Sequence, residues 1–481
     1  MTEGVIVPAF CRPDLASDEY LRELGNTKRF AEILQLYPRF GEALRENPRS
    51  AVAEFGLEAD PEELRLLWDT DAVRTLRNDH ASGRPLPDIP LPLRRFSAFL
   101  KEKIAFSREW MSTSHPVDPS MAAWRKRQIA RTNSELGPAK GQSLVHVPVA
   151  IELCVGCSVG CWFCSVSAER LSQKADYAEI KHLWQEALLA IHDVIGDAAR
   201  WGFCYWATDP LDNPDYEAFC CDFADVFGRF PQTTTAIAWK DMERTKALLK
   251  LSREKRCELN RFSILTIGIL RSIYGEFSPE ELLHVELLPL NKEAGIPKAF
   301  SGRARQRQPP NGHSTHDADV ASTTSCVSGF LLNMVDRTIR LITPCNASDR
   351  WPLGHWVIDQ RVFADADDLR RQMNRMIAEH MPTHVKLERE VRFRSDLTWG
   401  VDSDGRTPQI QSRFINHDVT SLPDLNQVAW EVAQRPGSAE DVALRLELEK
   451  NVPLENTLYL LNNLFQRGLL EEEPCPANVG Q

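Results

Sequence analysis

The feature that most constrains the fold is a repeated alternation of strand and helix patterns in the middle of the chain. Strand patterns cover residues 145–153, 199–206, 233–239, 260–265 and 285–290. Helical patterns cover residues 177–195, 216–227 and 242–255. Repeated units of this kind build a parallel sheet with helices outside, either open or curled into a partial barrel. The sequence therefore predicts an α/β fold for residues 141–300.

The regions on either side of this alternation have different patterns. Residues 1–140 are expected to form a helical domain, with a helix start at Asp60–Glu63. Residues 301–390 open with a polar loop, and a hairpin is expected from 329–335 and 338–343. Residues 391–475 are expected to contain a second hairpin, 391–399 with 409–415, and helices over 425–434, 439–449 and 454–467. A hairpin followed by three short helices predicts a winged-helix-like domain.

Composition narrows the function classes. The chain has 481 residues, too many for one ordinary core, and its formal net charge of −11 disfavours a nucleic-acid partner. The first residues do not resemble a secretory signal, and the most apolar stretch, 144–155, is too short to span a bilayer. We therefore expect a cytoplasmic protein with no membrane partner. In a reducing compartment, its 12 cysteines indicate a metal rather than a disulfide framework.

Three closely spaced cysteines follow the first predicted strand. Cys157, Cys161 and Cys164 have the spacing C-x3-C-x2-C, with the aromatic Phe163 just before the last cysteine. Three thiolates on one loop can hold three irons of a 4Fe-4S cluster and leave the fourth iron open. The alternative is a structural zinc site that includes Cys154. Zinc sites, however, usually pair two C-x2-C units across a long spacer, which this segment lacks.

These cysteines and the strand–helix alternation resemble the radical S-adenosylmethionine (SAM) superfamily, whose core is a partial β/α barrel. The resemblance implies that the open iron binds SAM and that an electron from the cluster splits SAM to a 5′-deoxyadenosyl radical. It also implies SAM contacts from the aromatic before the last cysteine, the loop after the second strand and the fourth strand: Phe163, Ala207, Thr208, Asp209, Asn260, Arg261 and Ser263. The loop departs from the usual Gly-Gly-Glu pattern. The fourth-strand residues are equally well explained as ordinary polar residues at a strand end.

Longer strings resemble a narrower group, the radical SAM peptide epimerases that mature ribosomally made peptides. These strings are 151–157, 203–215 and 344–354. The resemblance implies L-to-D epimerisation: the adenosyl radical removes a Cα hydrogen, and a cysteine returns one from the opposite face. Cys345, at the end of a late predicted strand, is the expected donor, because the mouth of such barrels holds the active site. The alternative is another peptide-modifying radical SAM enzyme that forms a thioether or C–C bond or excises a residue.

The expected partners are the ribosomal precursor peptide, with its leader and core, and an electron donor such as flavodoxin or ferredoxin. The C-terminal pattern resembles the leader-recognition element of peptide-modifying enzymes, in which a leader adds as a strand to the hairpin edge. A nucleic-acid-binding winged helix would need basic side chains on the helix 454–467, which carries one arginine. From a different class, a catalytically silent leader-binding protein or a zinc-bound regulator also fits these patterns.

Three further features have simpler interpretations. The segment 40–57 resembles a nitrile-hydratase-type leader, but it also suits a plain helical cap. Cys326 and Cys345 bracket the late hairpin, yet too few cysteines remain outside the barrel for an auxiliary cluster. His313 and His316 lie in a loop of small polar residues and are expected to be solvated.

Overall fold

The computed structural model describes residues 5–85, 87–113, 115–257, 259–307, 322–401, 405 and 407–474, without the side chains of 110–113. His313, His316 and Cys475 lie outside the described residues. The chain divides into two compact units, each built from two separate stretches. Unit 1 is Met1–Thr113 with Asp209–Pro297, and unit 2 is Ser114–Thr208 with Lys298–Gln481. The units thus interleave along the chain, whereas the sequence patterns suggest four consecutive domains.

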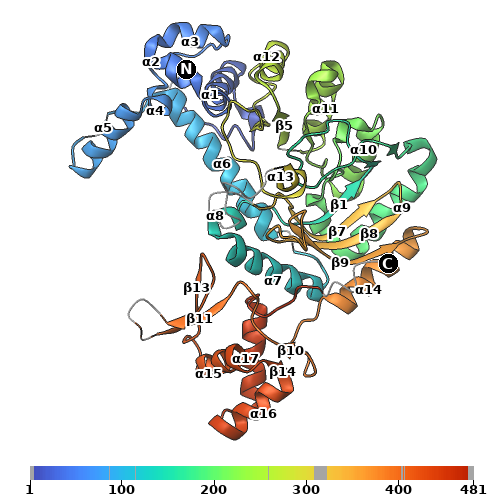
Figure 1. Ribbon diagram of the computed structural model, residues 1–481. Helices are drawn as coiled ribbons and strands as arrows, with labels where there is room; N and C mark the ends of the chain where they lie inside the picture. The colour runs from blue at the N-terminus through green and yellow to red at the C-terminus, as the bar shows by residue number, and fades with distance from the viewer. Residues whose placement is uncertain are drawn as a thin grey trace. The chain divides into compact units, whose positions relative to one another are not determined.

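Unit 1 combines helices with a small parallel sheet (Figure 1). The helices are η1 Pro13–Leu15, α1 Asp18–Leu36, α2 Arg39–Glu46, α3 Pro48–Glu54, α4 Arg65–Trp68, α5 Thr70–Ala81, α6 Leu91–Thr113, η3 Pro210–Asp212, α10 Tyr216–Phe227, η4 Ala238–Lys240, α11 Met242–Glu254 and α12 Ile267–Glu276. The sheet has the order β4 (Thr234–Thr235), β5 (Asn260–Ile264) and β6 (Val285–Pro289), and its neighbours are parallel.

The core of unit 1 joins its N-terminal helices to this sheet. Phe40 and Leu44 on α2 are buried in one cluster with Phe30 on α1 and Phe262 on β5. The rings of Phe30 and Phe40 meet edge to face, with centroids 5.3 Å apart. The leader-like segment 40–57 therefore contributes core side chains, which favours the helical cap over a leader mimic.

Unit 2 is built on a four-stranded sheet of order β1-β7-β8-β9 (Figure 1). Its strands are β1 Val147–Glu152, β7 Val327–Asn333, β8 Thr338–Pro344 and β9 His355–Val362. The other elements before the C-terminal domain are α7 Pro119–Leu136, α8 Pro138–Gly141, β2 Cys154–Val155, β3 Gln173–Lys174, α9 Tyr177–Ile195, η2 Gly196–Trp201, α13 Gly302–Arg307 and α14 Ala366–His380. β1 is parallel to β7, whereas β8 is antiparallel to both β7 and β9. Every residue of β1 and β7 is buried, as expected for a parallel pair of strands covered on both faces.

The C-terminal part of unit 2 has a hydrophobic core of its own. Its elements are β10 Glu390–Val391, β11 Thr398–Val401, β12 Pro408–Gln411, β13 Asn416–Asp418, α15 Leu425–Gln434, β14 Gly437–Ser438, α16 Ala439–Lys450 and α17 Leu454–Gln466. The hairpin predicted from 391–399 and 409–415 is found only in part. Its strands are β11 and β12, with β13 as a third antiparallel strand, whereas Val391 pairs with Gly437 on β14. The three predicted helices are present too, and Ser438 and Asp441 form a capping box at the start of α16.

The mixed α/β class is confirmed, but several predicted elements differ. Residues 199–206 do not form a strand: η2 ends at Trp201, and one parallel bridge joins Phe203 to Ala150. The chain passes close to β1 here, and a Cβ on Gly202 would lie 2.7 Å from Cγ1 of Val149. The predicted strand 233–239 is reduced to the two residues of β4, and the helix expected to start at Asp60–Glu63 begins at Arg65.

The described parallel strands belong to two separate sheets and do not form the continuous sheet of a partial barrel. β4, β5 and β6 pair in unit 1, whereas β1 pairs with β7 in unit 2. The strand β9 and the helix α14 were not predicted from the sequence.

Candidate functional site

The cysteine loop, residues 157–164, is anchored by the strand that precedes it. After β1 ends at Glu152, the chain forms β2, and the loop returns through β3, which pairs antiparallel with β2. The amide of Cys157 donates to the carbonyl of Glu169 at 2.9 Å, so the base of the loop is closed by backbone bonds. Gly156 has φ 83°, and a Cβ there would lie 2.3 Å from the carbonyl oxygen of Arg170. Only glycine fits this close approach.

The three thiols of this loop are half-buried, whereas Cys154 is buried on β2. The pKa of Cys161 is raised to about 11, first by burial and then by the nearby Cys157 and Cys164. The backbone amide of Ala168 donates to Sγ of Cys164 at 3.3 Å. The loop thus gathers its sulfurs in one partly accessible place, and one of them already accepts a hydrogen bond from the backbone.

The short helix α13 donates hydrogen bonds to backbone carbonyls of the cysteine loop. The amide of Arg303 donates to the carbonyl of Cys164 at 2.9 Å, and its guanidinium donates to the carbonyl of Cys161 at 2.5 Å. The same guanidinium also donates to the carbonyl of Ala168. Gly302, at φ 55°, packs against Ser165 so closely that a Cβ would lie 2.2 Å from its carbonyl oxygen. These contacts fix the loop through its backbone carbonyls.

The same helix contacts the loop that carries Cys345, which we define as residues 345–354. The amide of Gly302 donates to the carbonyl of Pro352 at 2.7 Å, and Arg305 forms an ion pair of 2.6 Å with Asp349. α13 therefore bridges the cysteine loop and the Cys345 loop within unit 2. Sequence reasoning missed Arg303 and Arg305, because they adjoin a polar stretch that shows no motif.

Cys345 itself is 1% exposed and packs with Trp351 and Trp356. Burial raises the pKa of this thiol well above its usual value, and the nearby Glu135 raises it further. The carboxylate of Glu135 accepts from the amide of Asn346 at 2.7 Å, and the guanidinium of Arg131 lies 3.8 Å from the ring centroid of Trp356. The sulfur is consequently held as a neutral S–H at physiological pH.

The position of Cys345 at a strand end does not place it at the edge of the sheet that carries the cysteine loop. β8 is antiparallel to β7, as the hairpin predicted from 329–335 and 338–343 requires, and β7 is parallel to β1. The last residues of β8 are therefore level with the beginning of β1 and β7. The Cys345 loop therefore leaves the sheet at the edge opposite Glu152, and its link to the cysteine loop is made by α13.

A buried carboxylate contacts the loop that carries Ala207 and Thr208, which the sequence predicts to bind SAM. Glu152, the last residue of β1, accepts a hydrogen bond from the amide of Ala207 at 3.1 Å. Its other partners are the Asn333 amide at 3.3 Å and the Arg340 guanidinium at 3.2 Å. Burial raises the pKa of Glu152, and Arg340 opposes that shift. Phe163 and Thr208 are half-buried, so the predicted residues of unit 2 remain partly accessible.

The other predicted SAM contacts, Asp209, Asn260, Arg261 and Ser263, lie in unit 1. The Asp209 carboxylate accepts from the hydroxyl of Thr235 at 2.8 Å, and burial raises its pKa to about 6. Asn260 is the first residue of β5, and its amide donates to Ser252 at 2.9 Å. Arg261 pairs with Glu286 at 2.8 Å, and Ser263 is buried.

These side chains of unit 1 therefore have contacts that stabilise their own unit. Unit 2 contains the other predicted site residues: Cys157, Cys161, Phe163, Cys164, Ala207, Thr208 and Cys345.

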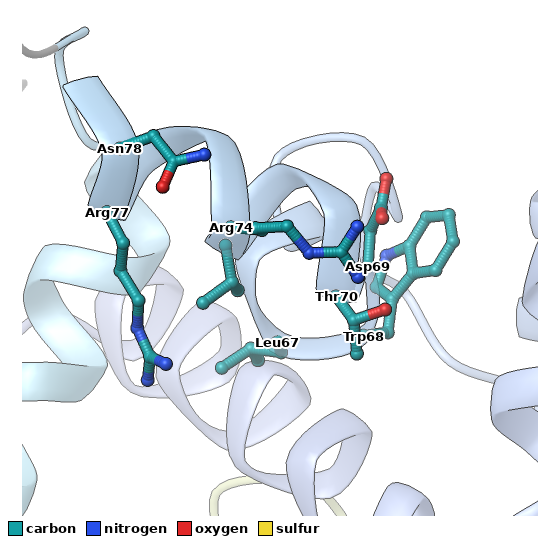
Figure 2. Close-up of a pocket in the computed structure, with 8 residues that line it drawn as sticks. Leu67, Trp68, Asp69, Thr70, Arg74, Arg77 and Asn78 are labelled. Carbon is teal, nitrogen blue, oxygen red and sulfur yellow. The ribbon is translucent and has the colours of Figure 1, made fainter.

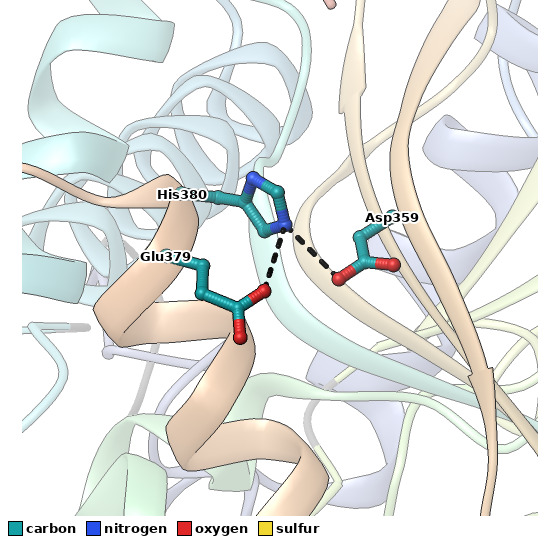
Figure 3. A group of neighbouring side chains, drawn as sticks. All are labelled: Asp359, Glu379 and His380. Carbon is teal, nitrogen blue, oxygen red and sulfur yellow. Dashed lines mark hydrogen bonds and ion pairs between the residues drawn. The ribbon is translucent and has the colours of Figure 1, made fainter. Parts of the chain in front are cut away.

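Two other features, a surface pocket and a group of three possible metal ligands, contain none of the predicted site residues. A surface pocket lies at the corner between α4 and α5 (Figure 2), and none of its lining residues is a predicted site residue: Leu67, Trp68, Asp69, Thr70, Val73, Arg74, Arg77 and Asn78. Within the part of the chain that is described, the one set of three side chains close enough to share a metal ion is Asp359, Glu379 and His380 (Figure 3). Arg361 already pairs with Asp359 at 2.7 Å and with Glu379 at 2.5 Å, so a guanidinium supplies the positive charge there.

No family model matches the chain. The uncharacterized protein y4wI of Sinorhizobium fredii is 35% identical over 470 residues, which cover 95% of this chain and 88% of y4wI. The chain belongs to the y4wI family. Because y4wI is uncharacterized, membership of the y4wI family assigns no activity.

Among solved structures, a partial similarity is found to the crystal structure of BtrN in complex with AdoMet and 2-DOIA. It has 14% sequence identity and a TM-score of 0.32, and it covers 49% of this chain and 82% of BtrN. A similarity of this size assigns neither fold nor function. In the described part of the chain, no helix is both long enough and apolar enough to cross a membrane.

Proposed function

We propose that the protein is a radical SAM enzyme in which Cys157, Cys161 and Cys164 hold a 4Fe-4S cluster. The observation that carries this proposal is the cysteine loop itself, in which half-buried thiols sit on a backbone fixed at both Cys161 and Cys164 by Arg303. Protein-bound clusters take one thiolate per iron and are stabilised by hydrogen bonds to the sulfurs, as the amide of Ala168 provides for Cys164. The residues present therefore fit the cluster.

The structural zinc site is less well supported. It would require the sulfurs to surround one ion at about 2.3 Å, with Cys154 as the fourth ligand. The described cysteines do not form a set close enough to share one ion, and Cys154 is 1% exposed on β2. A cluster binds each thiolate at a different iron, so it does not require the three sulfurs to share one ion.

The finer proposal is peptidyl L-to-D epimerisation. When bound, the cluster and SAM would supply the 5′-deoxyadenosyl radical that removes a Cα hydrogen from the peptide. Cys345 would return a hydrogen atom to the opposite face of that carbon, and one electron from the proposed electron donor with one proton would restore its thiol. Its burial supports this role, because the raised pKa of Cys345 keeps the S–H bond intact and the two tryptophans exclude water. The approach of a peptide to Cys345 would require the Cys345 loop to open.

The C-terminal domain is proposed to bind the leader of a ribosomal precursor peptide. β11 is an edge strand of its three-stranded sheet and contacts α15, so an added strand would have both backbone partners and an apolar neighbour. α17 offers no basic face to a nucleic acid, since it carries no lysine or arginine between Leu454 and Gln466. An electron donor such as flavodoxin or ferredoxin completes the proposed set of partners.

The test has two stages. Anaerobically reconstituted protein should contain about four irons and four sulfides per chain and should cleave SAM to 5′-deoxyadenosine when reduced. A protein that binds one zinc and no sulfide would reject the radical SAM proposal. The precursor encoded near the gene is then co-expressed in heavy water, where each epimerised residue should gain one deuterium from the exchanged thiol. A change in peptide mass beyond the deuterium would instead indicate crosslinking or excision.

A further inference from the structure

A lysine near the cysteine loop has no hydrogen-bond acceptor among the described residues. Lys298 lies just before α13, and its Nζ atom is buried. Nζ lies over the ring of Phe163, 5.1 Å from the ring centroid. Phe163 stands between Cys161 and Cys164, so the ammonium group faces the middle of the cysteine loop.

This arrangement is unfavourable without a further partner. An ammonium group has three N–H donors, and the face of an aromatic ring replaces only part of the water that it loses on burial. Burial lowers the pKa of Lys298, and no charged group of the described chain contributes to that shift. A side chain this long can normally extend into solvent and keep its charge hydrated. The described residues thus provide no hydrogen-bond acceptor for the buried ammonium.

An anion beside Phe163 would explain it. We propose that Lys298 is the anion-pairing residue of the cysteine loop, which compensates negative charge placed against Phe163 by the cofactors. This inference rests on the proposed function. The negative charge has two chemically similar sources, the thiolate-ligated cluster and the carboxylate of SAM. Sequence reasoning did not find Lys298, because it lies outside every motif.

The experiment compares Lys298→Met with Lys298→Arg in the reconstituted full-length protein. Methionine keeps the length of the side chain and removes its charge, whereas arginine keeps the charge. Lys292→Met, which alters an exposed lysine earlier in the same segment, is the matched control. Iron and sulfide content and the melting temperature confirm that each variant folds and carries its cluster.

Two measurements distinguish the sources of charge. If the partner is the SAM carboxylate, Lys298→Met should weaken SAM binding by about tenfold or more, because a charge-assisted hydrogen bond is lost. Binding of 5′-methylthioadenosine, which lacks the carboxylate, should then be unchanged. If the partner is the cluster, the midpoint potential measured without SAM should become more negative, because a nearby cation favours the reduced form. Lys298→Arg should retain most of either property.

Unchanged SAM affinity and unchanged potential in Lys298→Met would overturn this inference while leaving the proposed function intact. A wild-type protein that forms no cluster would remove both. An effect of equal size in Lys292→Met would also count against the inference, because a general change in surface charge would then account for it.

Discussion

The cysteine loop and the Cys345 loop use the same reactive side chain in two opposite ways. The thiols of residues 157–164 are half-buried and open to a ligand, whereas Cys345 is 1% exposed beneath two tryptophans. A metal ligand must be reachable during assembly of the cluster. A hydrogen donor must keep its proton and stay away from water until the substrate arrives. The difference teaches that burial, rather than residue type, separates the two proposed roles.

The two loops are also supported differently. The cysteine loop is held through its own backbone carbonyls by Arg303, so its side chains are left for chemistry. The Cys345 loop depends on side chains from distant parts of unit 2. The indole of Trp351 donates to Glu473 at 2.7 Å, and Glu135 accepts from the amide of Asn346. The first loop is thus held by α13, and the second is also coupled to the C-terminal domain.

The largest effect is expected from removing a ligand thiol. Cys157→Ala, Cys161→Ala or Cys164→Ala should each abolish SAM cleavage, because one iron of the cluster loses its protein ligand. Iron content and 5′-deoxyadenosine yield measure the loss. Cys221→Ala, at a half-buried cysteine of unit 1, is the control and should retain the wild-type yield. SAM cleavage at the wild-type level by a cysteine-loop variant would show that the replaced thiol is not a cluster ligand, and the proposed difference in role between the two loops would be lost.

Replacement of the donor should separate hydrogen removal from hydrogen return. Cys345→Ala should still form 5′-deoxyadenosine in the presence of precursor, since that step needs no thiol on the opposite face. It should yield little or no D-residue in chiral amino-acid analysis. Cys345→Ser should fail in the same way, because an O–H bond is too strong to give hydrogen to a Cα radical. Epimerisation at the wild-type level by either variant would assign the donor role to another group.

Loss of the guanidinium that holds the cysteine loop should have an intermediate effect. Arg303→Met removes the guanidinium bonds to the carbonyls of Cys161 and Ala168, and we expect the free energy of unfolding to fall by about 3 kcal/mol. Less iron should be retained after reconstitution. Denaturant unfolding and iron analysis check both effects. Arg307→Met, at an exposed arginine of the same helix, should change neither, and similar losses in both variants would point to a general effect on α13.

The smallest effect is expected at the C-terminal support of the Cys345 loop. Glu473→Ala removes the bond to Trp351 and an ion pair of 2.8 Å with Arg350, which together should contribute about 1–2 kcal/mol. D-residue yield should fall several-fold while the iron content stays the same. The exposed Glu447→Ala is the matched control. A loss of iron in Glu473→Ala would show that the two loops are not supported independently.

Local patterns were sufficient for most of the helices and for the cysteine loop. α9 and α10 begin and end where the apolar periodicity predicts, and the capping box at Ser438 is formed. These elements depend on residues a few positions apart, so their signals lie within one short segment. The strand predicted over 199–206 is absent, because the conformation there depends on contacts with a distant segment. Its apolar residues pack close to β1 through Gly202, and a strand pattern does not reveal that approach.

By itself, the sequence determined the mixed α/β class, the position of the cysteine loop after β1 and the helical end of the chain. Only the tertiary structure decided that β7 lies beside β1 and parallel to it, and with that the edge of the sheet at which Cys345 lies. It also brought Arg303 to the cysteine loop and Glu152 to the amide of Ala207. These contacts join residues that are far apart in the chain. Their partners are chosen by packing and by the need to satisfy buried polar groups, which no local pattern encodes.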